Sequence, residues 1–399
     1  MPLVVFVLAA AVFAQGTSEF MLSGLLEPLA ADLGVPIGSA GLLTSLFAVG
    51  MVIGAPVMAA TARRWPVRYS LAGFLALFLG AHIVGALTTD FGVLLGTRLV
   101  AAVANAGFLA VALAALPALV GADRVGRATS LILSGVTLAC IAGVPAGAAL
   151  GRMFGWQSAF WAIVLTGAPI LAATWLLVPG QPERPEPAER PRVRGELRAL
   201  GGPAVWLVMV LGALVNAATF AGFTYLAVVA TDIGGAGQAW VPVVLALFGI
   251  GSFAGVNAAG RYADRHSGVM IAAGVAVLPL IWIVTALTAR LLPALLCMTV
   301  LAGAASFAVG STLIGRIVTA AAPVAPLLNG AFATTAFNIG AAGGPAVAGA
   351  VIGLSGSVVA ALWTSAGLAV VAAVLTALAR PRPAASAAVD AQPETTPTA

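Results

Sequence analysis

Charged side chains are scarce in this chain, and lysine is missing altogether. Only 8% of the 399 residues are charged, while 61% are hydrophobic. A soluble domain of this length could not cover its surface with so few charges, so the soluble globular classes are excluded. Cysteine is rare too. Cys140 and Cys297 both fall in apolar runs without the spacing of metal ligands, so neither a disulfide framework nor a metal site is expected.

Signatures of catalysis are also missing. The chain has no P-loop for ATP, and its scattered Ser, His and Cys residues form no recognisable hydrolase set. The stretch GIGSFAG from Gly249 has the glycine spacing of a dinucleotide loop, but it lies inside an apolar run with no preceding strand, so helix packing explains it better. We therefore expect no enzyme. A sensor without transport activity would be expected to carry an added signalling domain, for which the linker and tail are too short.

Long apolar runs are what the chain has in abundance. Each of twelve runs has 18 or more residues, enough for a helix to cross a hydrocarbon core of roughly 30 Å. We predict an all-α membrane protein with spans at 3–26, 38–62, 69–88, 92–116, 128–151, 158–178, 204–230, 240–261, 268–288, 291–315, 325–353 and 355–378. No positive charge precedes the first run and another span follows it, so it is taken as a mature span rather than a secretion signal.

The arginines indicate how the spans are oriented. Fifteen of the eighteen lie in alternate loops and the tail, whereas the opposite loops hold only Arg152 and Arg290. By the positive-inside rule, both termini and the long middle loop are predicted to be cytoplasmic, in a protein of the cytoplasmic (inner) membrane. The basic excess therefore reflects topology, and no nucleic-acid partner is expected.

The chain divides into two related halves. Residues 179–203 carry six prolines and nine charges, which predicts a cytoplasmic linker between a six-span half at 1–178 and another at 204–379. The polar tail, 380–399, is predicted to be disordered. LFAVGMVIGAPVMAATARR from Leu46 aligns with LFGIGSFAGVNAAGRYADR from Leu247 with six identities, and AGVPAGA aligns with AGGPAVA at nearly the same offset. Two matches on equivalent spans indicate an internal repeat.

Parallel repeats of six spans resemble the major facilitator transporters, which implies that fold, with two pseudo-symmetric bundles of six helices. GRYADRH, from Gly260 to His266, is similar to the loop motif of that family. The resemblance assigns conformational roles to Gly260, Asp264 and Arg265 in the second half, and to Arg64 and Arg68 in the first. The first-half copy has Arg63 where the family usually has Asp, so its usual charge network is not expected to be complete.

The fifth span carries a second motif, GVPAGAALGRMFGWQSAFW. Gly143, Gly147 and Gly151 recur every four residues and predict a flat face for close helix packing. Pro145 removes one backbone hydrogen bond and allows a bend. The combination resembles the Gly-Pro motif of drug:proton antiporters, which implies export and a conformational role for Gly143, Pro145 and Gly147.

The N-terminal block, AQGTSEFMLSGLLEPLAADLGV, is the most specific. It resembles the chloramphenicol-resistance exporters of actinobacteria, which implies proton-driven efflux of a small amphipathic drug by a monomer in the lipid bilayer, with the proton gradient in place of any cofactor. Related sugar exporters share the TSEF and LAADLGV patterns, typically with Pro where Glu27 stands. Efflux of a sugar or another small metabolite is therefore the alternative.

Two charged residues lie deep inside spans. Glu19 is the only one of thirteen acidic residues in such a position, and Arg98 is the only such basic residue. An ionised group at the bilayer centre costs roughly 2.5 to 3.5 kcal/mol or more, so such residues usually face a polar interior or each other. Both lie on the order of 10 Å below the outer surface at 1.5 Å per residue. We predict that they meet, or nearly meet, and couple proton movement to transport.

Other polar and aromatic side chains share faces with this pair. Gln15, Glu19 and Ser23 form a stripe on the first span, and Arg98 shares a face with Asn105. The predicted substrate cavity consists of Gln15, Ser23, Asn105, Asn216, Phe220, Phe223, Tyr225, Thr334 and Asn338. Its amide and aromatic character suits a largely uncharged amphipathic molecule. His82, in the third span, is expected to be structural, because that span is peripheral in the resembled fold.

Overall fold

The computed structural model describes residues 1–61, 65–121, 124–180, 202–325 and 329–379. Within these ranges every regular element is a helix, and no strand occurs. Twelve helical segments are long and apolar enough to span a membrane. This confirms the prediction of an all-α membrane protein with twelve spans. Most of the predicted linker and the whole predicted tail lie outside the described residues.

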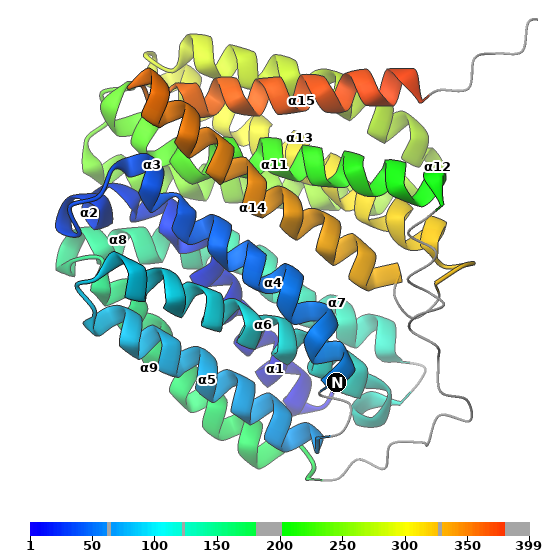
Figure 1. Ribbon diagram of the computed structural model, residues 1–399. Coiled ribbons are helices and arrows are strands. Elements are labelled where there is room, and N and C mark those ends of the chain that lie inside the picture. Colours follow the sequence, from blue (N-terminus) through cyan, green and yellow to red (C-terminus); the bar gives the residue numbers. More distant parts are fainter. Residues whose placement is uncertain (62–64, 122–123, 181–201, 326–328, 380–399) are drawn as a thin grey trace, which may run out of the picture.

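The first six spans are built from helices of unequal regularity (Figure 1). The first span begins with α1 and ends in a 3₁₀ turn, η1, while the fifth is made of α7, a π-helical turn η4, and α8. The elements in order are α1 (Leu3–Phe20), η1 (Met21–Gly24), α2 (Leu26–Asp32), α3 (Ile37–Ala40), α4 (Leu42–Thr61), α5 (Val67–Leu87), α6 (Phe91–Val120), α7 (Val125–Leu138), η4 (Ala139–Gly143), α8 (Val144–Phe154) and α9 (Gln157–Leu177).

The last six spans are built from fewer and more continuous helices. They consist of α11 (Pro203–Asp232), the short turn η6 (Gln238–Trp240), α12 (Val241–Thr288), α13 (Leu292–Ala321), α14 (Asn329–Ser355) and α15 (Ala360–Leu378). α12 contains two spans that bend at His266, where φ is −132° and ψ is 28°. The predicted loop between the eighth and ninth spans is therefore a break within one long helix.

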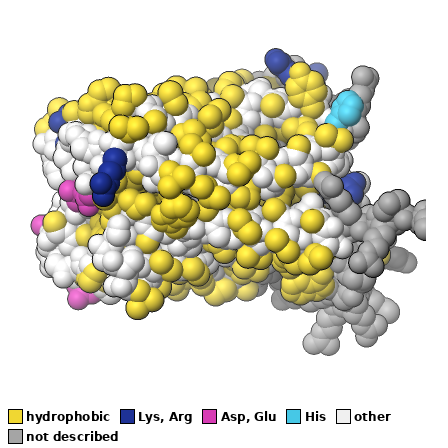
Figure 2. Space-filling view, turned by 90° about the horizontal axis from the view of Figure 1, so that it is seen from above, with side chains coloured by type: hydrophobic (Ala, Val, Ile, Leu, Met, Phe, Trp, Pro, Cys, Tyr) yellow, Lys and Arg dark blue, Asp and Glu magenta, His cyan; other side chains and the backbone are white. Residues whose placement is uncertain are grey.

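The outer surface of the helices is apolar. Large side chains such as Leu165, Leu176 and Leu354 are 71%, 75% and 89% exposed. Figure 2 shows hydrophobic side chains over the middle of one face, whereas the acidic side chains visible there lie at one end of the molecule. Exposed leucines on this scale suit contact with lipid rather than water. The surface thus agrees with a protein that passes through the membrane many times.

The helices pack in two groups that follow the sequence. α4, α5 and α6 pack side by side in the first group, and α11, α14 and α15 pack together in the second. Between the groups, α4 runs beside α14, and α12 packs on η4 and α8 (Figure 1). The arrangement agrees with the predicted major facilitator fold. The residue limits predicted for the two halves, 1–178 and 204–379, stay a prediction.

Close approach of glycine backbones joins the two groups. Gly249 of α12 lies so close to η4 that a Cβ placed on it would be 2.5 Å from the Cys140 carbonyl oxygen. Gly251 and Gly255 on the same helix lie against α13 in the same manner, near Val300 and Ala304. The GIGSFAG stretch is therefore a packing surface inside a helix, as predicted, because only glycine lets the helix axes approach this closely.

Candidate functional site

Arg98 is almost completely buried, and it reaches from α6 to α1. Its side chain is 1% exposed. Nη1 donates to the Ser18 hydroxyl oxygen at 2.9 Å, and Nη2 donates to the Ser18 carbonyl oxygen at 2.9 Å. The guanidinium also lies 4.4 Å from the centre of the Phe47 ring of α4, a favourable cation–π contact. Three helices of the first half therefore hold one cation.

Glu19 follows Ser18 directly, so its carboxyl group shares this region with Arg98. The two charges are close enough to interact. However, the described residues include no ion pair between them at or below 4.0 Å. Arg98 instead donates two hydrogen bonds to Ser18, and its buried Nε has no partner in the part of the chain that the structure describes. The structure thus brings the predicted coupling residues into one neighbourhood and leaves one arginine donor free for a carboxylate or a substrate.

His82 is part of the same cluster, and this position was not anticipated from the sequence. Its Nε2 lies 2.5 Å from the Ser18 hydroxyl oxygen, and its Nδ1 lies 2.7 Å from the Phe78 carbonyl oxygen. The ring is 1% exposed and packs between Phe78 and Phe160. The sequence spacing around a single buried His does not show which residues of other helices it contacts. The polar residues Ser18 and His82, each inside an apolar run, were the only available hint.

The predicted polar stripe on the first span is only partly continuous. Gln15 is 1% exposed, and neither of its amide atoms has a hydrogen-bond partner among the described residues. Ser23 is equally buried, but α1 ends at Phe20 and Ser23 lies in η1. A 3₁₀ turn winds more tightly than an α-helix, so Ser23 does not continue the spacing of Gln15 and Glu19. The prediction of one uninterrupted stripe was wrong at this residue.

Asn105 lies on α6 two turns beyond Arg98. Its side chain is 6% exposed, and no hydrogen bond to it occurs among the described residues. Buried amides normally have a partner within the protein or a bound molecule. Asn105 and Gln15 are accordingly the two predicted cavity residues whose amides remain free for a ligand or for water.

Two predicted cavity aromatics meet the first half at a ring cluster. Phe220 and Phe223 of α11 have ring centres 5.7 and 6.5 Å from that of Phe20, the residue after Glu19. Phe223 continues the cluster to Phe248 of α12, with centres 4.5 Å apart. The rings of the two halves therefore close over each other beside Glu19, and they have to separate when this region opens.

The polar residues predicted on α11 and α14 bond to backbone. Asn216 Nδ2 donates to the Phe337 carbonyl oxygen of α14 at 2.6 Å. Asn338 Nδ2 donates to the Thr334 carbonyl at 3.0 Å, and Thr334 Oγ1 donates to the Gly330 carbonyl at 3.0 Å. Asn216 thus joins two helices of the second half, while Thr334 and Asn338 bond within α14.

Tyr225 lies between the halves. Its ring is fully buried, and its hydroxyl is 3.2 Å from both the Gly38 carbonyl oxygen of α3 and the Pro345 carbonyl oxygen of α14. Beside it, a Cβ on Gly349 of α14 would be only 2.5 Å from the Gly38 carbonyl oxygen. This position was predicted as a cavity wall, but the contacts make Tyr225 a clasp at the end of the molecule that carries α2 and α3.

Glu27 adds a polar contact at the same end. Its Oε2 accepts hydrogen bonds from Gln238 Nε2 at 2.7 Å and from Thr231 Oγ1 at 3.3 Å. Both donors belong to the second half, whereas Glu27 lies on α2 in the first. Together, Glu27, Tyr225 and the Gly38–Gly349 contact close this end; we call these four residues the end clasp.

The glycines of the fifth span pack against the first span with matching spacing. A Cβ on Gly143 would overlap Thr17, one on Gly147 would lie 3.3 Å from Met21 Cβ, and one on Gly151 would overlap Leu25. Each glycine and each partner is four residues from the next, which confirms the predicted flat packing face. Pro145 follows η4 at the start of α8. The π-turn places the break in regular helix just before the proline.

Replacement of Gly143 by Val is expected to lower the thermal stability of the purified protein and to reduce transport at least tenfold. The added side chain has no room beside Thr17, which directly precedes Ser18 and Glu19 in α1. The helix α1 and the turn η4 must therefore separate. Gly80→Val is the matched control, because no atom of the described residues lies within 4 Å of a Cβ on Gly80. Equal melting temperatures and transport rates for the two variants would refute the packing role.

The conformational-motif residues are described only in part. Arg68 Nε donates to the Val178 carbonyl oxygen at 2.6 Å, directly after α9, and the guanidinium carbon lies 6.0 Å from the Trp175 ring centre. Arg68 therefore ties the start of α5 to the end of α9. Gly260 lies on α12 with open space beside it. Arg64 and the side chains of Asp264 and Arg265 lie outside the described residues, so their predicted roles stay predictions.

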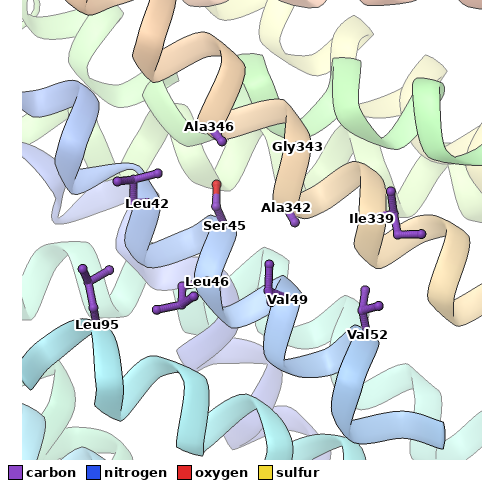
Figure 3. A pocket seen from close by; sticks show the side chains of 10 residues that line it. All are labelled: Leu42, Ser45, Leu46, Val49, Val52, Leu95, Ile339, Ala342, Gly343 and Ala346. Carbon is purple, nitrogen blue, oxygen red and sulfur yellow. The ribbon is translucent and has the colours of Figure 1, made fainter. Parts of the chain in front are cut away.

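A pocket of about 590 Å³ lies where α4 meets α14 (Figure 3). Its lining is almost entirely aliphatic, and in the close-up the Ser45 hydroxyl points from α4 toward α14. That hydroxyl is buried, and no described residue forms a hydrogen bond with it. None of the predicted site residues that the structure describes lines this pocket. The pocket is thus an apolar gap between the halves, separate from the Glu19–Arg98 region.

Known proteins share both the sequence and the fold. The chain is 50% identical over 377 residues to the "Chloramphenicol resistance protein" of Streptomyces lividans, covering 94% of this chain and 96% of that protein. It is 31% identical over 345 residues to the "Inner membrane transport protein YdhP" of Escherichia coli K12, covering 86% and 87%.

The fold comparison agrees with these relatives. A bacterial homolog of the human lysosomal transporter Spinster, in its inward-facing and unoccupied conformation, superposes with a TM-score of 0.75 at 15% identity, covering 94% of this chain and 96% of that one. At this low identity the likeness concerns the fold alone. Residues 8–333 match the Major Facilitator Superfamily. On the strength of this match and of the close relatives, the chain belongs to the Major Facilitator Superfamily and is a multi-pass membrane transporter of small molecules.

Proposed function

We propose that this protein exports chloramphenicol or a related phenicol in exchange for protons. The observation that carries the substrate assignment is the 50% identity, over almost the whole length of both chains, to a chloramphenicol resistance protein. The predicted site is compatible with such a molecule, because it combines free amides at Gln15 and Asn105 with the aromatic rings of Phe220 and Phe223. A neutral amphipathic drug needs both kinds of contact.

Proton exchange is assigned to Glu19 and Arg98. Burial favours the neutral form of a carboxyl group, whereas a nearby cation favours the charged form. A carboxyl group held between these influences changes charge when a bound drug or a conformational change alters either one. The protein needs no cofactor beyond the proton gradient, and its chemistry is transport and not catalysis.

Alternating access supplies the transport step. The end clasp joins the halves at the end where α1 and α11 finish, and the two halves rock about the site so that this end opens while the opposite end closes. With the positive-inside orientation, both termini are cytoplasmic, the clasp is on the outer side of the inner membrane, and the structure is closed outward. A monomer contains the whole pathway.

The test is accumulation of labelled chloramphenicol in an efflux-deficient bacterial host. Cells that express the protein should accumulate several-fold less drug than cells with the empty vector, and a protonophore should restore the higher level. Higher accumulation on expression would overturn export. Unchanged drug accumulation with active efflux of a labelled sugar would favour the alternative, which the TSEF and LAADLGV patterns shared with sugar exporters also support.

A further inference from the structure

The Ser18 hydroxyl is the meeting point of three helices. Arg98 of α6 donates to it through Nη1, His82 of α5 contacts it through Nε2, and Ser18 itself belongs to α1. All three residues are at most 1% exposed. Within the described hydrogen bonds, these three residues are joined to one another and to backbone carbonyl oxygens, as expected of buried polar groups. The pattern of donors and acceptors in this cluster is therefore fixed.

The fixed pattern defines the form of His82. The Phe78 carbonyl oxygen can only accept, so His82 Nδ1 carries the hydrogen of that 2.7 Å bond. In the neutral ring, Nε2 is then an acceptor, and the Ser18 hydroxyl donates its only hydrogen to it. This leaves the lone pairs of the Ser18 oxygen facing Arg98 Nη1, which is the orientation that a cationic donor requires.

We propose that His82 is a positioning residue for the coupling pair: by accepting the Ser18 hydrogen, it orients the Ser18 oxygen to hold Arg98 away from a direct ion pair with Glu19. The inference rests on the proposed role of Glu19 and Arg98 in proton exchange. Without an acceptor at position 82, the Ser18 hydroxyl can turn its hydrogen toward Nη1 and weaken that bond. Arg98 is then free to approach Glu19 and stabilise its charged form.

Other groups around the cluster do not replace His82. The titratable or charged residues that face it are Glu19 on α1, Arg98 on α6 and the buried thiol of Cys140 on η4, which interacts with Glu19. α4 and α9 contribute the rings of Phe47 and Phe160. No second acceptor for the Ser18 hydrogen is found among the described hydrogen bonds. A purely packing role would require only a ring between Phe78 and Phe160.

Two substitutions at one position separate positioning from packing. His82→Phe keeps a ring but removes the acceptor, whereas His82→Gln loses the ring but places an amide oxygen at about the reach of Nε2. We expect His82→Phe to lower the pH of half-maximal drug-induced proton release by about one unit and to reduce uphill export about tenfold, with the KM for chloramphenicol within about twofold of wild type. His82→Gln should keep the pH of half-maximal proton release and the rate of uphill export close to their wild-type values.

Ser18→Ala provides an independent variant, because it removes the hydroxyl that links His82 to Arg98. It should produce the same pH shift as His82→Phe, and the double variant should be no worse than Ser18→Ala alone, since both changes break one chain of contacts. If His82→Phe fails to fold, as judged by its melting temperature in detergent, the two single variants Ser18→Ala and His82→Gln decide the question. Ser18→Ala should show the pH shift, and His82→Gln should stay close to wild type.

The outcomes distinguish this inference from the proposed function. Wild-type pH profiles in His82→Phe and Ser18→Ala would overturn the positioning role, and so would equal impairment of His82→Phe and His82→Gln in folded protein. If the wild-type protein releases no protons on adding chloramphenicol, the proposed function itself fails. The geometry requires that the wild-type protein releases protons, that His82→Phe shows the pH shift, and that His82→Gln does not.

Discussion

Replacement of Glu19 by Gln is expected to abolish uphill drug export while leaving the fold intact. Gln keeps the size and hydrogen-bonding capacity of the side chain but cannot gain or lose a proton. The neutral amide is also cheaper to bury than a carboxylate, for which the penalty at the bilayer centre begins at roughly 2.5 kcal/mol. Since Arg98 is held mainly by Ser18 and Phe47, it retains its contacts in the variant.

The measurement is proton-driven chloramphenicol uptake into everted membrane vesicles, together with downhill drug exchange in liposomes. Uphill transport should fall to background in Glu19→Gln, and downhill exchange should persist, because rocking a loaded carrier does not itself require a proton. Glu19→Asp should keep partial coupling. Asp90→Asn is the matched control. It removes a carboxylate from the N-cap of α6, while the amide oxygen of Asn can still accept the hydrogen bond from the Val93 N–H group.

Replacement of Gly349 by Leu is the second change expected to have a large effect. A Cβ at this position would lie 2.5 Å from the Gly38 carbonyl oxygen and 2.6 Å from the Tyr225 hydroxyl oxygen, so the closed arrangement of the end clasp cannot form. The open arrangement separates these groups and tolerates the larger side chain. The variant should therefore favour the conformation that is open at this end and lose at least 90% of its transport rate, because a carrier fixed in one state cannot cycle.

The shift toward the conformation that is open at the end clasp can be measured by labelling a cysteine introduced at Leu245, in a protein that lacks Cys140 and Cys297. Leu245 is 1% exposed, and a Cβ placed on Gly24 of the first half would lie 2.7 Å from its Cδ1. A membrane-impermeant maleimide should label it faster in Gly349→Leu than in the parent. Gly353→Leu is the control, because Gly353 lies one turn further along α14 and a Cβ there has no neighbour within 4 Å in the described structure. Slow labelling and normal transport in Gly349→Leu would show that the clasp does not limit opening.

Much of the fold could be predicted from the sequence because the membrane imposes simple rules. Runs of apolar residues had to be helices, since a backbone in lipid must satisfy its own hydrogen bonds. The glycine spacing at 143, 147 and 151 predicted a packing face, and the structure confirms it against Thr17, Met21 and Leu25. These signals lie within single helices, where periodicity alone is sufficient.

The missed features depend on contacts between helices or on local breaks in helical geometry. The 3₁₀ turn at Met21–Gly24 and the π-turn at Ala139–Gly143 contain residues that fit a regular helix equally well. Tyr225 was predicted as a cavity residue because it lies near Asn216, Phe220 and Phe223 in the same span, yet its hydroxyl reaches α3 and α14. The cluster of Ser18, His82 and Arg98 joins three spans, and no spacing rule connects residues so far apart in sequence.

The most direct test of the central claim is proton release on drug binding by the detergent-purified protein. In weakly buffered solution, saturating chloramphenicol should release protons from the wild-type protein, and the release should disappear in Glu19→Gln, with drug binding confirmed in the same sample. That result would establish that the carboxyl group of Glu19 exchanges its proton for the drug. If Glu19→Gln binds chloramphenicol and releases as many protons as the wild-type protein, Glu19 is not the coupling group and the account is wrong.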